Sequence, residues 1–494
     1  MENNKSKTLS ANDFLEETDK LLAVANSQKE KREHNQLSDI FKQLLEHIEE
    51  VDFRKYAELS TNEKPRKVHF LVSIIEILLE KAISLGFHLC RKYDYVYLYN
   101  GEYWQLVGQE EFEDFLCQVA LKTKMNRFYA KYFAFKGDMY KQFLSDARLK
   151  ELQKNSKTTL INLANGTFEI SPFARVLRPF CKNDFLTYQL PFSYNQTATA
   201  PMFQGYLDRV LPEQELQDVL SEYLGYIFIK NNVLKLEKVL LAYGSGANGK
   251  SVLFDIINAL LGEENFTSYS LQSLTEDKGY YRAMLTNKLL NYASEINGKL
   301  ETNTFKLLVS GEPVEARLPF GKPKLIKDYA RFMFNCNELP ENIENNNAFF
   351  RRFLILPFKV TIPVKEQDPD LSKRIIQEEL SGVLNWMLQG TNRLLKNRKF
   401  TDSAIVRNEI LKYQKERDTI FMFLEDMDYE PNTVMDIPLQ SLFSEYRTFC
   451  VESNYNFESK KSFSKRMQKL GYAIQRKNYG MAIYVKKKVL SSAT

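Results

Sequence analysis

The chain has 494 residues, of which 44% are apolar and 27% charged, and this composition is typical of a folded globular protein rather than of a disordered one. Its length allows about three or four domains. No apolar run approaches roughly 18 residues, so the sequence excludes an ordinary membrane-spanning helix. Because the first residues also lack the apolar centre of a signal peptide, we expect a cytoplasmic protein, in a bacterial host or its equivalent, without a membrane partner.

The net charge of +5 is unevenly distributed along the chain. Between Lys460 and Lys488 there are ten Lys or Arg residues and no Asp or Glu, so the remainder of the chain is net negative. A concentrated basic segment is typical of a nucleic-acid contact, and a solvated lysine-rich surface is the alternative. The five cysteines are scattered without a CxxC pair, which argues against a disulfide framework or a zinc site.

The first half of the chain falls into two predicted parts. Residues 1–65 are charged and mostly helical in pattern, and we interpret them as an interaction or lid segment. Residues 66–234 mix helices with two β-hairpins, at the Asn-Gly pairs 100–101 and 165–166, because Asn-Gly supplies both positive-φ positions of a tight turn. Residues 110–150 interleave aromatic and basic side chains, which can bind single strands by stacking. Such aromatics are more often core residues, and we favour that interpretation.

A glycine-rich octapeptide, GSGANGKS, lies at residues 244–251, between an apolar run at 239–243 and an apolar-periodic helix that ends before Gly262. Strand, glycine-rich turn and helix form the context in which the GxxxxGKS pattern binds a nucleotide. Backbone N–H groups and the helix N-terminus face the anion, Lys250 reaches the β- and γ-phosphates, and Ser251 can hold Mg²⁺. We therefore predict a site for ATP and Mg²⁺ formed by Gly244, Ser245, Gly246, Ala247, Asn248, Gly249, Lys250 and Ser251.

Hydrolysis also needs a carboxylate that polarises water, a polar group that senses the γ-phosphate and, in many ATPases, an arginine from a neighbouring subunit. Glu295 stands at the carboxyl end of a predicted strand, where ligands bind in open parallel sheets. Asn337 follows a second buried-strand pattern, and Arg351 and Arg352 precede a third. We predict that Glu295 activates water and contacts the metal, that Asn337 is the sensor, and that one arginine acts in trans. The alternatives are a surface Glu, a turn Asn and structural salt bridges.

Between the Glu and Asn strands, residues 314–326 fit a β-hairpin. Its predicted tip carries Lys322 and Lys324 beside the ring of Phe320. Ammonium groups suit the phosphates of a DNA backbone, and an aromatic ring offers a stacking surface. We predict that this tip contacts DNA.

Residues 400–494 are predicted to form three helices followed by a two-stranded ribbon. This order is typical of a winged helix, a variant of the helix-turn-helix. The third helix and the ribbon carry most of the basic segment, so charge coincides with the elements that would meet DNA. The predicted DNA-binding residues of this domain are Lys460, Lys461, Lys465, Arg466, Lys469, Arg476 and Lys477.

The series GSGANGKS, SEIN, KLLVSGEPVEAR, FNCNELP and FFRRFLILPF resembles superfamily 3 helicases, specifically the phage and plasmid primase-helicase family related to the poxvirus primase-helicase. The likeness runs from about residue 90 to the end of the chain. The resemblance implies an α/β fold with an AAA+ type P-loop ATPase core over residues 235–399, a mixed α+β region before it and the winged helix after it. It also implies a hexameric ring that binds ATP between subunits and drives single-stranded DNA through a central channel, with the hairpin gripping DNA inside the ring.

Two features depart from this resemblance. Ser294 stands before Glu295 where many P-loop ATPases carry a second acid, so the Mg²⁺ side of the site has one carboxylate fewer. Residues 1–150 offer no closely spaced carboxylates for a two-metal polymerase site, so we expect a helicase without a primase, and a separate primase or initiator as a candidate partner.

The sequence therefore predicts an ATP-driven, ring-forming DNA helicase that acts in the replication of a phage, plasmid or other mobile genetic element. The alternative is an ATP-switched origin-binding initiator or loader, which melts or marks DNA without processive unwinding. A small-molecule kinase fits less well, because it requires neither the basic C-terminal domain nor the lysine-tipped hairpin.

Overall fold

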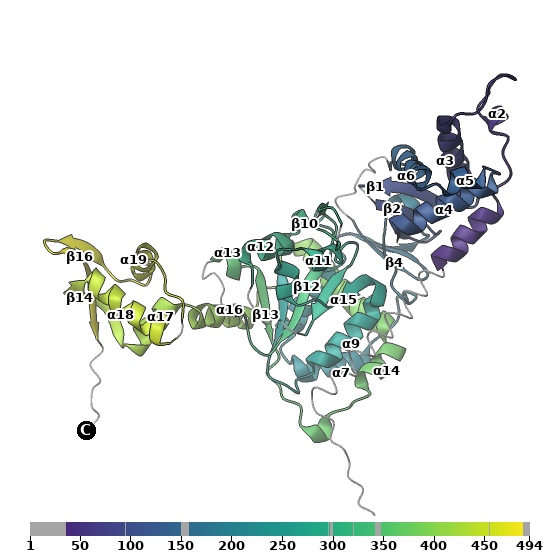
Figure 1. Ribbon diagram of the computed structural model, residues 1–494. Coiled ribbons are helices and arrows are strands. Elements are labelled where there is room, and N and C mark those ends of the chain that lie inside the picture. The colour runs from purple at the N-terminus through teal and green to yellow at the C-terminus, as the bar shows by residue number, and fades with distance from the viewer. Residues whose placement is uncertain are drawn as a thin grey trace, which may run out of the picture. The chain divides into compact units, whose positions relative to one another are not determined.

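The computed structural model describes residues 36–93, 95–149, 158–294, 296, 300–319, 321–340, 347–453 and 455–487. The described residues form two compact units, and Figure 1 labels their elements. Among these residues, no helix is both long and apolar enough to cross a membrane. The first unit comprises residues 36–149 and 178–189, and the second comprises 158–177 and 190–487.

The first unit combines a three-stranded antiparallel sheet, in the order β1-β2-β3, with a group of helices. Helices α3 and α4 both pack against α6, and their buried side chains include Leu78, Phe115 and Phe143. One apolar core therefore joins the helices. The elements are a helix over 36–46, α2 (Phe53–Tyr56), α3 (Lys67–Ser84), β1 (His88–Lys92), β2 (Tyr95–Tyr99), β3 (Trp104–Val107), α4 (Gln109–Lys122), α5 (Arg127–Lys131), α6 (Phe133–Asp146) and η1 (Lys182–Asp184).

The described part of residues 1–65 differs from the separate segment that the charge pattern predicts. Leu37 and Phe41 are buried on the first described helix and belong to the same core as α3. The ring of Phe41 stacks on that of Phe115 in α4, with 3.9 Å between centroids. The charges lie on the outer face of an amphipathic helix, so the first unit begins before residue 66. Residues 1–35 lie outside the described part of the chain.

The first predicted hairpin is present, but its turn differs from the expected one. Four residues connect β2 to β3. Gly101 has a φ of 102°, whereas the side chain of Asn100 accepts hydrogen bonds from the backbone N–H groups of Glu102 and Tyr103, both at 2.9 Å. The prediction of two positive φ angles is therefore wrong, because Asn100 stabilises the turn through its side chain.

A five-stranded parallel sheet forms the centre of the second unit, in the order β13-β7-β12-β9-β8. The nearly continuous apolar sequences of β7 and β13 are buried, as a parallel sheet covered on both faces requires. Because the carboxyl ends of parallel strands lie at one edge, the loops after β7, β9 and β12 meet there. The elements are β7 (Val239–Tyr243), α9 (Lys250–Leu261), η2 (Glu263–Asn265), β8 (Phe266–Thr267), α10 (Leu271–Thr275), α11 (Tyr280–Ala283), β9 (Leu290–Ala293), α12 (Thr302–Ser310), β10 (Val314–Ala316), β11 (Lys324–Ile326), β12 (Arg331–Cys336), α13 (Asn347–Phe350) and β13 (Phe353–Pro357).

Helices from before and after the sheet pack together in the second unit, and α9 lies against α14 (Figure 1). Helix α8 crosses α15 closely, because a Cβ on Gly390 would lie 2.3 Å from the backbone of Ser221. The fully buried Glu222 of α8 pairs with Arg393 of α15 at 2.7 Å. The predicted boundary at residue 234 therefore divides elements that share one unit.

The elements that flank the sheet in the chain are β4 (Thr159–Leu163), β5 (Gly166–Ile170), β6 (Arg175–Arg178), α7 (Pro201–Val210), α8 (Gln214–Tyr226), η3 (Val364–Glu366), α14 (Leu371–Glu378) and α15 (Leu380–Asn397). The hairpin β4–β5 is the second predicted one, and it pairs Leu163 with Gly166.

The C-terminal part of the second unit has a core of its own, which includes Phe423, Tyr446 and Phe463. The three predicted helices and the ribbon are present, and an additional strand, β14, lies between the first two helices. The sheet order is β14-β16-β15. Strand β14 lies at the edge of this sheet and contains two prolines: Pro431 stands where the register shifts before Asp436, and Pro438 is the last residue of the strand. Helix α16 (Ala404–Glu416) instead packs on β13, and its Tyr413 belongs to the core of the parallel sheet. The elements of the C-terminal part are α17 (Thr419–Asp426), β14 (Tyr429–Pro438), α18 (Leu439–Glu452), α19 (Lys460–Lys469), β15 (Ile474–Lys477) and β16 (Gly480–Lys487).

Candidate nucleotide-binding site

The glycine-rich loop, residues 244–251, connects β7 to α9 at the carboxyl edge of the sheet. Gly249 has a φ of 86°, a conformation that favours glycine. Gly244 admits no side chain, because a Cβ there would lie 2.3 Å from the carbonyl oxygen of Phe358. An added Cβ on Gly246 would meet no described atom within 4 Å, so open space lies beside the middle of the loop. No described side chain caps α9, which leaves the first N–H groups of the helix for an anion.

The ammonium group of Lys250 is held inside the loop. It donates hydrogen bonds to the carbonyl oxygens of Gly244 (2.6 Å) and Ser245 (3.0 Å) and to Oδ1 of Asn248 (3.0 Å). Burial lowers the pKa of Lys250, because the charged form loses water. The neutral oxygens around the ammonium group supply no full negative charge, so this arrangement favours an anionic ligand.

A pocket of about 950 Å³ opens beside the loop, a volume that suits a nucleotide because small-molecule sites span roughly 300–1,000 Å³. Residues 246–252 line it, together with Ser294 after β9 and Asn337 after β12. Residues from the carboxyl ends of three neighbouring strands thus share one pocket. Asn337 is exposed, and Ser251 lies exposed in the first turn of α9, where a hydroxyl ligand of Mg²⁺ would fit.

The predicted catalytic carboxylate, Glu295, lies outside the described residues. Its neighbour Ser294 lines the pocket. Of the two metal ligands that the sequence predicts, the structure describes Ser251, and the contribution of Glu295 stays a prediction.

Tyr206 and Arg209 line the pocket from α7, which precedes the sheet in the chain. The hydroxyl of Tyr206 donates a hydrogen bond to the carbonyl oxygen of Gly249 at 2.9 Å, so α7 is tied to the glycine-rich loop. Sequence reasoning misses both residues, because the contact joins segments 43 residues apart and no local pattern signals it.

Two carboxylates on the rim of the pocket are paired with arginines. Arg209 pairs with Glu366, and Arg374 pairs with Asp368. The hydrogen bond from Arg374 lowers the pKa of Asp368. Because each carboxylate has a cationic partner, the rim repels a nucleotide less than two unpaired carboxylates would.

A buried polar network lies beneath the pocket. Asn335 of β12 accepts a hydrogen bond from the hydroxyl of Tyr292 in β9 at 2.8 Å, and its amide lies 3.5 Å from the carbonyl oxygen of Lys250. The amide of Asn248 donates to the carbonyl oxygen of Phe358, just after β13, at 3.1 Å. These contacts fix the loop to three strands, which pre-organises it for a ligand.

The predicted arginine pair lies at the opposite edge of the sheet. Both residues directly precede β13, and the carbonyl oxygen of Arg352 accepts a hydrogen bond from the N–H of Val239, at the start of β7, at 2.8 Å. At about 3.3 Å per residue, a strand of five residues separates this edge from the glycine-rich loop by roughly 16 Å. The arginines therefore lie away from the loop of their own chain.

The two arginines differ in exposure. The side chain of Arg351 is 64% exposed and pairs with Glu237 at 3.2 Å. Arg352 is buried and donates to Oγ of Ser310 at 3.1 Å and to the carbonyl oxygen of Ala348. Burial lowers the pKa of Arg352, and Glu237 opposes this effect. Arg352 is thus held within its own chain, and Arg351 presents its guanidinium to solvent.

The predicted hairpin at residues 314–326 is present, with β10 antiparallel to β11. Lys322 and Lys324 are exposed, and Leu325 is 63% exposed. Phe320 lies outside the described residues. The described residues of the hairpin therefore offer cations and an apolar side chain to solvent.

Some basic residues of the C-terminal part are engaged within it. Nε of Arg466 donates to the buried Asp418 at 2.7 Å, and Lys477 pairs with Asp436 at 2.5 Å. Lys460 donates to a glutamine of α18 at 2.5 Å. These contacts connect elements of the same small core, so the three cations contribute to its stability.

The other predicted cations face solvent. Lys461, Lys465 and Lys469 repeat every four residues along α19, so they follow one side of the helix. All three are exposed, and so is Arg476 on β15. This row is the part of the basic segment that is best placed to meet a polyanion.

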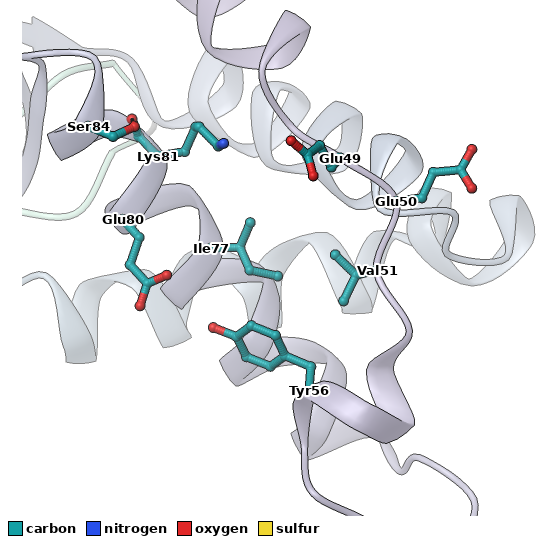
Figure 2. A pocket seen from close by; sticks show the side chains of 8 residues that line it. All are labelled: Glu49, Glu50, Val51, Tyr56, Ile77, Glu80, Lys81 and Ser84. Atoms are coloured by element: carbon teal, nitrogen blue, oxygen red, sulfur yellow. Dashed lines mark hydrogen bonds between the residues drawn. The ribbon is translucent and has the colours of Figure 1, made fainter.

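A second, smaller hollow of about 320 Å³ lies in the first unit, between α3 and the segment before α2. Figure 2 shows Glu80 and Lys81 on α3, with Glu49 and Glu50 on the other segment and Tyr56 beside them. Three carboxylates and one ammonium group make this hollow acidic. It is therefore unsuited to the phosphates of a nucleotide.

Three family models match successive parts of the chain. Residues 77–212 match the family described as D5 N terminal like, residues 242–352 match a family of unknown function (DUF5906), and residues 415–489 match the Poxvirus D5 protein-like family. The second of these segments contains the glycine-rich loop and the strands β9 and β12, and the third contains α17 to β16.

Two viral relatives match about three fifths of the chain. The "Putative helicase L207/L206" of Acanthamoeba polyphaga mimivirus is 23% identical over 339 residues, which cover 62% of this chain and 34% of the relative. The "Putative helicase 121R" of Invertebrate iridescent virus 3 is 22% identical over 333 residues, which cover 60% of this chain and 35% of the relative. The chain thus spans about a third of the length of these curated relatives.

Among solved structures, the A form apo structure of the NrS-1 C terminal region is 13% identical, with a TM-score of 0.44, and 84% of this chain and 98% of that chain are covered. A second A form apo structure of that region is 12% identical, with a TM-score of 0.42, and 86% and 100% are covered. The two D5 family matches and the two viral relatives make this chain similar to poxvirus D5-type proteins and to putative viral helicases.

Proposed function

We propose that the chain is an ATP-hydrolysing DNA helicase that assembles into a ring and acts in the replication of a phage, plasmid or other mobile genetic element. The observation that carries this proposal is the pocket that joins the glycine-rich loop to Ser294 and Asn337 at the carboxyl ends of three neighbouring strands. Both viral relatives are named as putative helicases, which supports a nucleic-acid strand as the object of the hydrolysis.

In this proposal, the phosphates of ATP lie against the loop and the N-terminus of α9. Lys250 exchanges its carbonyl partners for the β- and γ-phosphates, and Asn337 orients the γ-phosphate or the attacking water. Ser251 and Glu295 hold Mg²⁺, which neutralises charge on the phosphates. Glu295 also polarises the attacking water. The adenine packs against apolar side chains of the pocket lining, which include Val210 of α7 and Ile362.

The arginine that completes the site comes from a neighbouring copy in this proposal. Arg351 lies a strand's length from its own loop and is exposed, whereas Arg352 is occupied by contacts within its chain. We therefore assign the trans role to Arg351. An AAA+ type ring supplies the necessary geometry, because a heterologous interface that closes repeats the same contact around the ring.

The DNA contacts are assigned to two basic regions. Lys322 and Lys324 on the β10–β11 hairpin track the backbone of a single strand, because exposed ammonium groups suit phosphates. In the C-terminal part we assign a winged helix, with α19 as the recognition helix and β15–β16 as the wing.

The test is ATP hydrolysis and strand displacement on a forked duplex. We expect single-stranded DNA to stimulate hydrolysis, and Lys250→Ala to abolish both hydrolysis and displacement. Lys396→Ala, which removes an exposed lysine of α15 outside the pocket, is the matched control and should leave both intact. Hydrolysis without displacement on any substrate would contradict the helicase.

The exposed lysine row of α19 favours a second candidate, an origin-binding initiator or loader, because such a row suits duplex DNA. A footprint confined to one sequence, with no displacement, would support that function instead.

A further inference from the structure

The first unit carries four exposed aromatic side chains, Phe128, Tyr129, Tyr132 and Phe133, which we call the aromatic surface. Phe128 is 74% exposed and Phe133 77%, and the two tyrosines are 38% and 53% exposed. From the sequence we interpret the aromatic residues of 110–150 as core residues, and these four are exposed instead. Because large aromatic side chains gain most from burial, a group of them left in solvent marks an interaction surface.

The turn that presents these rings is anchored on both sides. The side chain of Asn126 accepts hydrogen bonds from the backbone N–H groups of Phe128 at 3.0 Å and Tyr129 at 3.4 Å, and so caps α5. Ala130 and Phe135, which lie among the exposed rings in sequence, are buried in the core of the unit. Packing and capping therefore hold the aromatic surface in place.

The surroundings of the aromatic surface are basic. From residue 115 to residue 137 there are five Lys or Arg residues and no Asp or Glu, although Lys124 pairs with Glu50 and Lys136 with Asp114. Arg127 and Lys131 are exposed, and the guanidinium of Arg127 lies 4.7 Å from the ring centroid of Phe128. The next acidic residue, Asp138, pairs with lysines of α3 and α6. A ligand that meets these rings therefore also meets the positive charges of Arg127 and Lys131.

We propose that the aromatic surface binds single-stranded DNA, with bases stacked on the exposed rings and phosphates near Arg127 and Lys131. Stacking on aromatic side chains tolerates any base sequence, because every base has a π-face. Duplex DNA fits less well, because its bases are already stacked on one another. A protein partner also fits less well, because the centres of protein interfaces are depleted of charge.

The choice of DNA as the ligand rests on the proposed function. The aromatic surface would give the helicase a strand-binding site in the first unit, whereas the nucleotide pocket lies in the second. This site uses no residue of the nucleotide pocket. Strand binding at the aromatic surface therefore does not require hydrolysis, and it can be measured when hydrolysis is blocked.

The experiment measures the binding of a fluorescent oligo-dT by anisotropy, with the full chain carrying Lys250→Ala throughout. Adding Phe128→Ala and Phe133→Ala should weaken binding by roughly tenfold or more, because two rings that stack on bases are removed. Phe173→Ala is the matched control, since Phe173 is 97% exposed and lies outside the aromatic surface, and it should leave the affinity unchanged. Phe128→Tyr with Phe133→Trp should retain binding, because both replacements keep a ring.

Two further readouts locate the strand. Replacing Arg127 and Lys131 with Gln should lower the slope of log affinity against log salt by about one for each phosphate that the variant no longer neutralises. An oligonucleotide that carries 5-iododeoxyuridine should cross-link to the aromatic surface. Melting curves of each variant exclude unfolding as the cause.

Three outcomes would overturn the inference. The first is an unchanged oligo-dT affinity in the Phe128→Ala, Phe133→Ala variant. The second is cross-linking confined to other elements, and the third is a change in subunit association with DNA binding intact, which would make the surface an interface between copies. A chain that binds oligo-dT through this surface and displaces no strand would instead contradict the proposed helicase and leave this inference standing.

Discussion

The two edges of the five-stranded sheet carry the two halves of the proposed ATPase chemistry, and they are built differently. At the carboxyl edge, backbone carbonyls and buried asparagines hold Lys250 beside an open pocket. At the amino edge, Arg351 is exposed and Arg352 is buried among contacts of its own chain. The first edge is pre-organised for a ligand, and the second presents a cation outward. This difference is the basis of our proposal that one chain offers halves of two sites.

The largest expected effect is that of Arg351→Ala, which should lower the rate of ATP turnover by roughly 10³-fold or more, because an arginine finger contributes that much to phosphoryl transfer. ATP binding to the pocket of the same chain should persist, since Arg351 lies at the other edge of the sheet. Turnover at saturating ATP and binding of a fluorescent nucleotide separate the two effects. A variant with wild-type turnover would contradict the trans assignment.

Arg352→Ala should act on stability. Its guanidinium is buried and donates to Ser310 and to the carbonyl oxygen of Ala348, so removal leaves buried acceptors without a donor and should lower the free energy of unfolding by about 1–3 kcal/mol. Chemical denaturation of the Arg351→Ala and Arg352→Ala variants compares the pair directly. Equal stabilities would show that the difference in burial has no energetic consequence.

Lys238, next to this edge, should make stability depend on pH. Burial, and secondarily the charge of Arg351, lower its pKa from 10.5 to about 8, while the ammonium group donates to the carbonyl oxygen of Arg351 at 2.5 Å. Below pH 8 the folded and unfolded states are both protonated, and the folded state carries the cost of a buried charge. Between pH 8 and 10.5 the unfolded state binds more protons, so stability rises with pH, by about 3 kcal/mol at most.

Lys238→Met removes this titration. Urea denaturation at pH 7 and pH 10 should show wild type gaining stability relative to the variant at the higher pH. A constant difference between the two proteins would contradict the lowered pKa.

The smallest expected effect is that of Tyr206→Phe at the carboxyl edge. The change removes one hydrogen bond to the carbonyl oxygen of Gly249, which contributes about 1 kcal/mol, so nucleotide affinity should fall by roughly fivefold. Calorimetric titration with a non-hydrolysable ATP analogue measures this. An unchanged affinity would show that α7 does not position the loop.

Local sequence patterns predict much of this architecture. The glycine-rich loop, its flanking strand and helix, and the hairpin at residues 314–326 depend on contacts between near neighbours in the chain, and all are present. The position of Asn337 after a strand also predicts that it lies near the glycine-rich loop, because parallel strands end at one edge, and Asn337 lines the same pocket as the loop.

Local sequence patterns do not predict features that depend on contacts between distant segments. Tyr206 reaches the loop through packing of α7, and burial separates two adjacent arginines that look alike in sequence. Strand β14 contains prolines and forms because β16 pairs with it. The rings of Phe128 and Phe133 share the pattern of buried neighbours such as Phe135, and the packing of the helices decides which of them is covered.

The measurement that tests the central claim most directly is subunit complementation. Lys250→Ala lacks the lysine of the loop, and Arg351→Ala lacks the arginine of the other edge, so neither protein alone should hydrolyse ATP appreciably. If each site uses the loop of one copy and Arg351 of the next, a mixture of the two inactive variants rebuilds intact sites at about a quarter of its interfaces. We predict that DNA-stimulated hydrolysis returns on mixing. A mixture that stays as inactive as its components would contradict a site shared between copies.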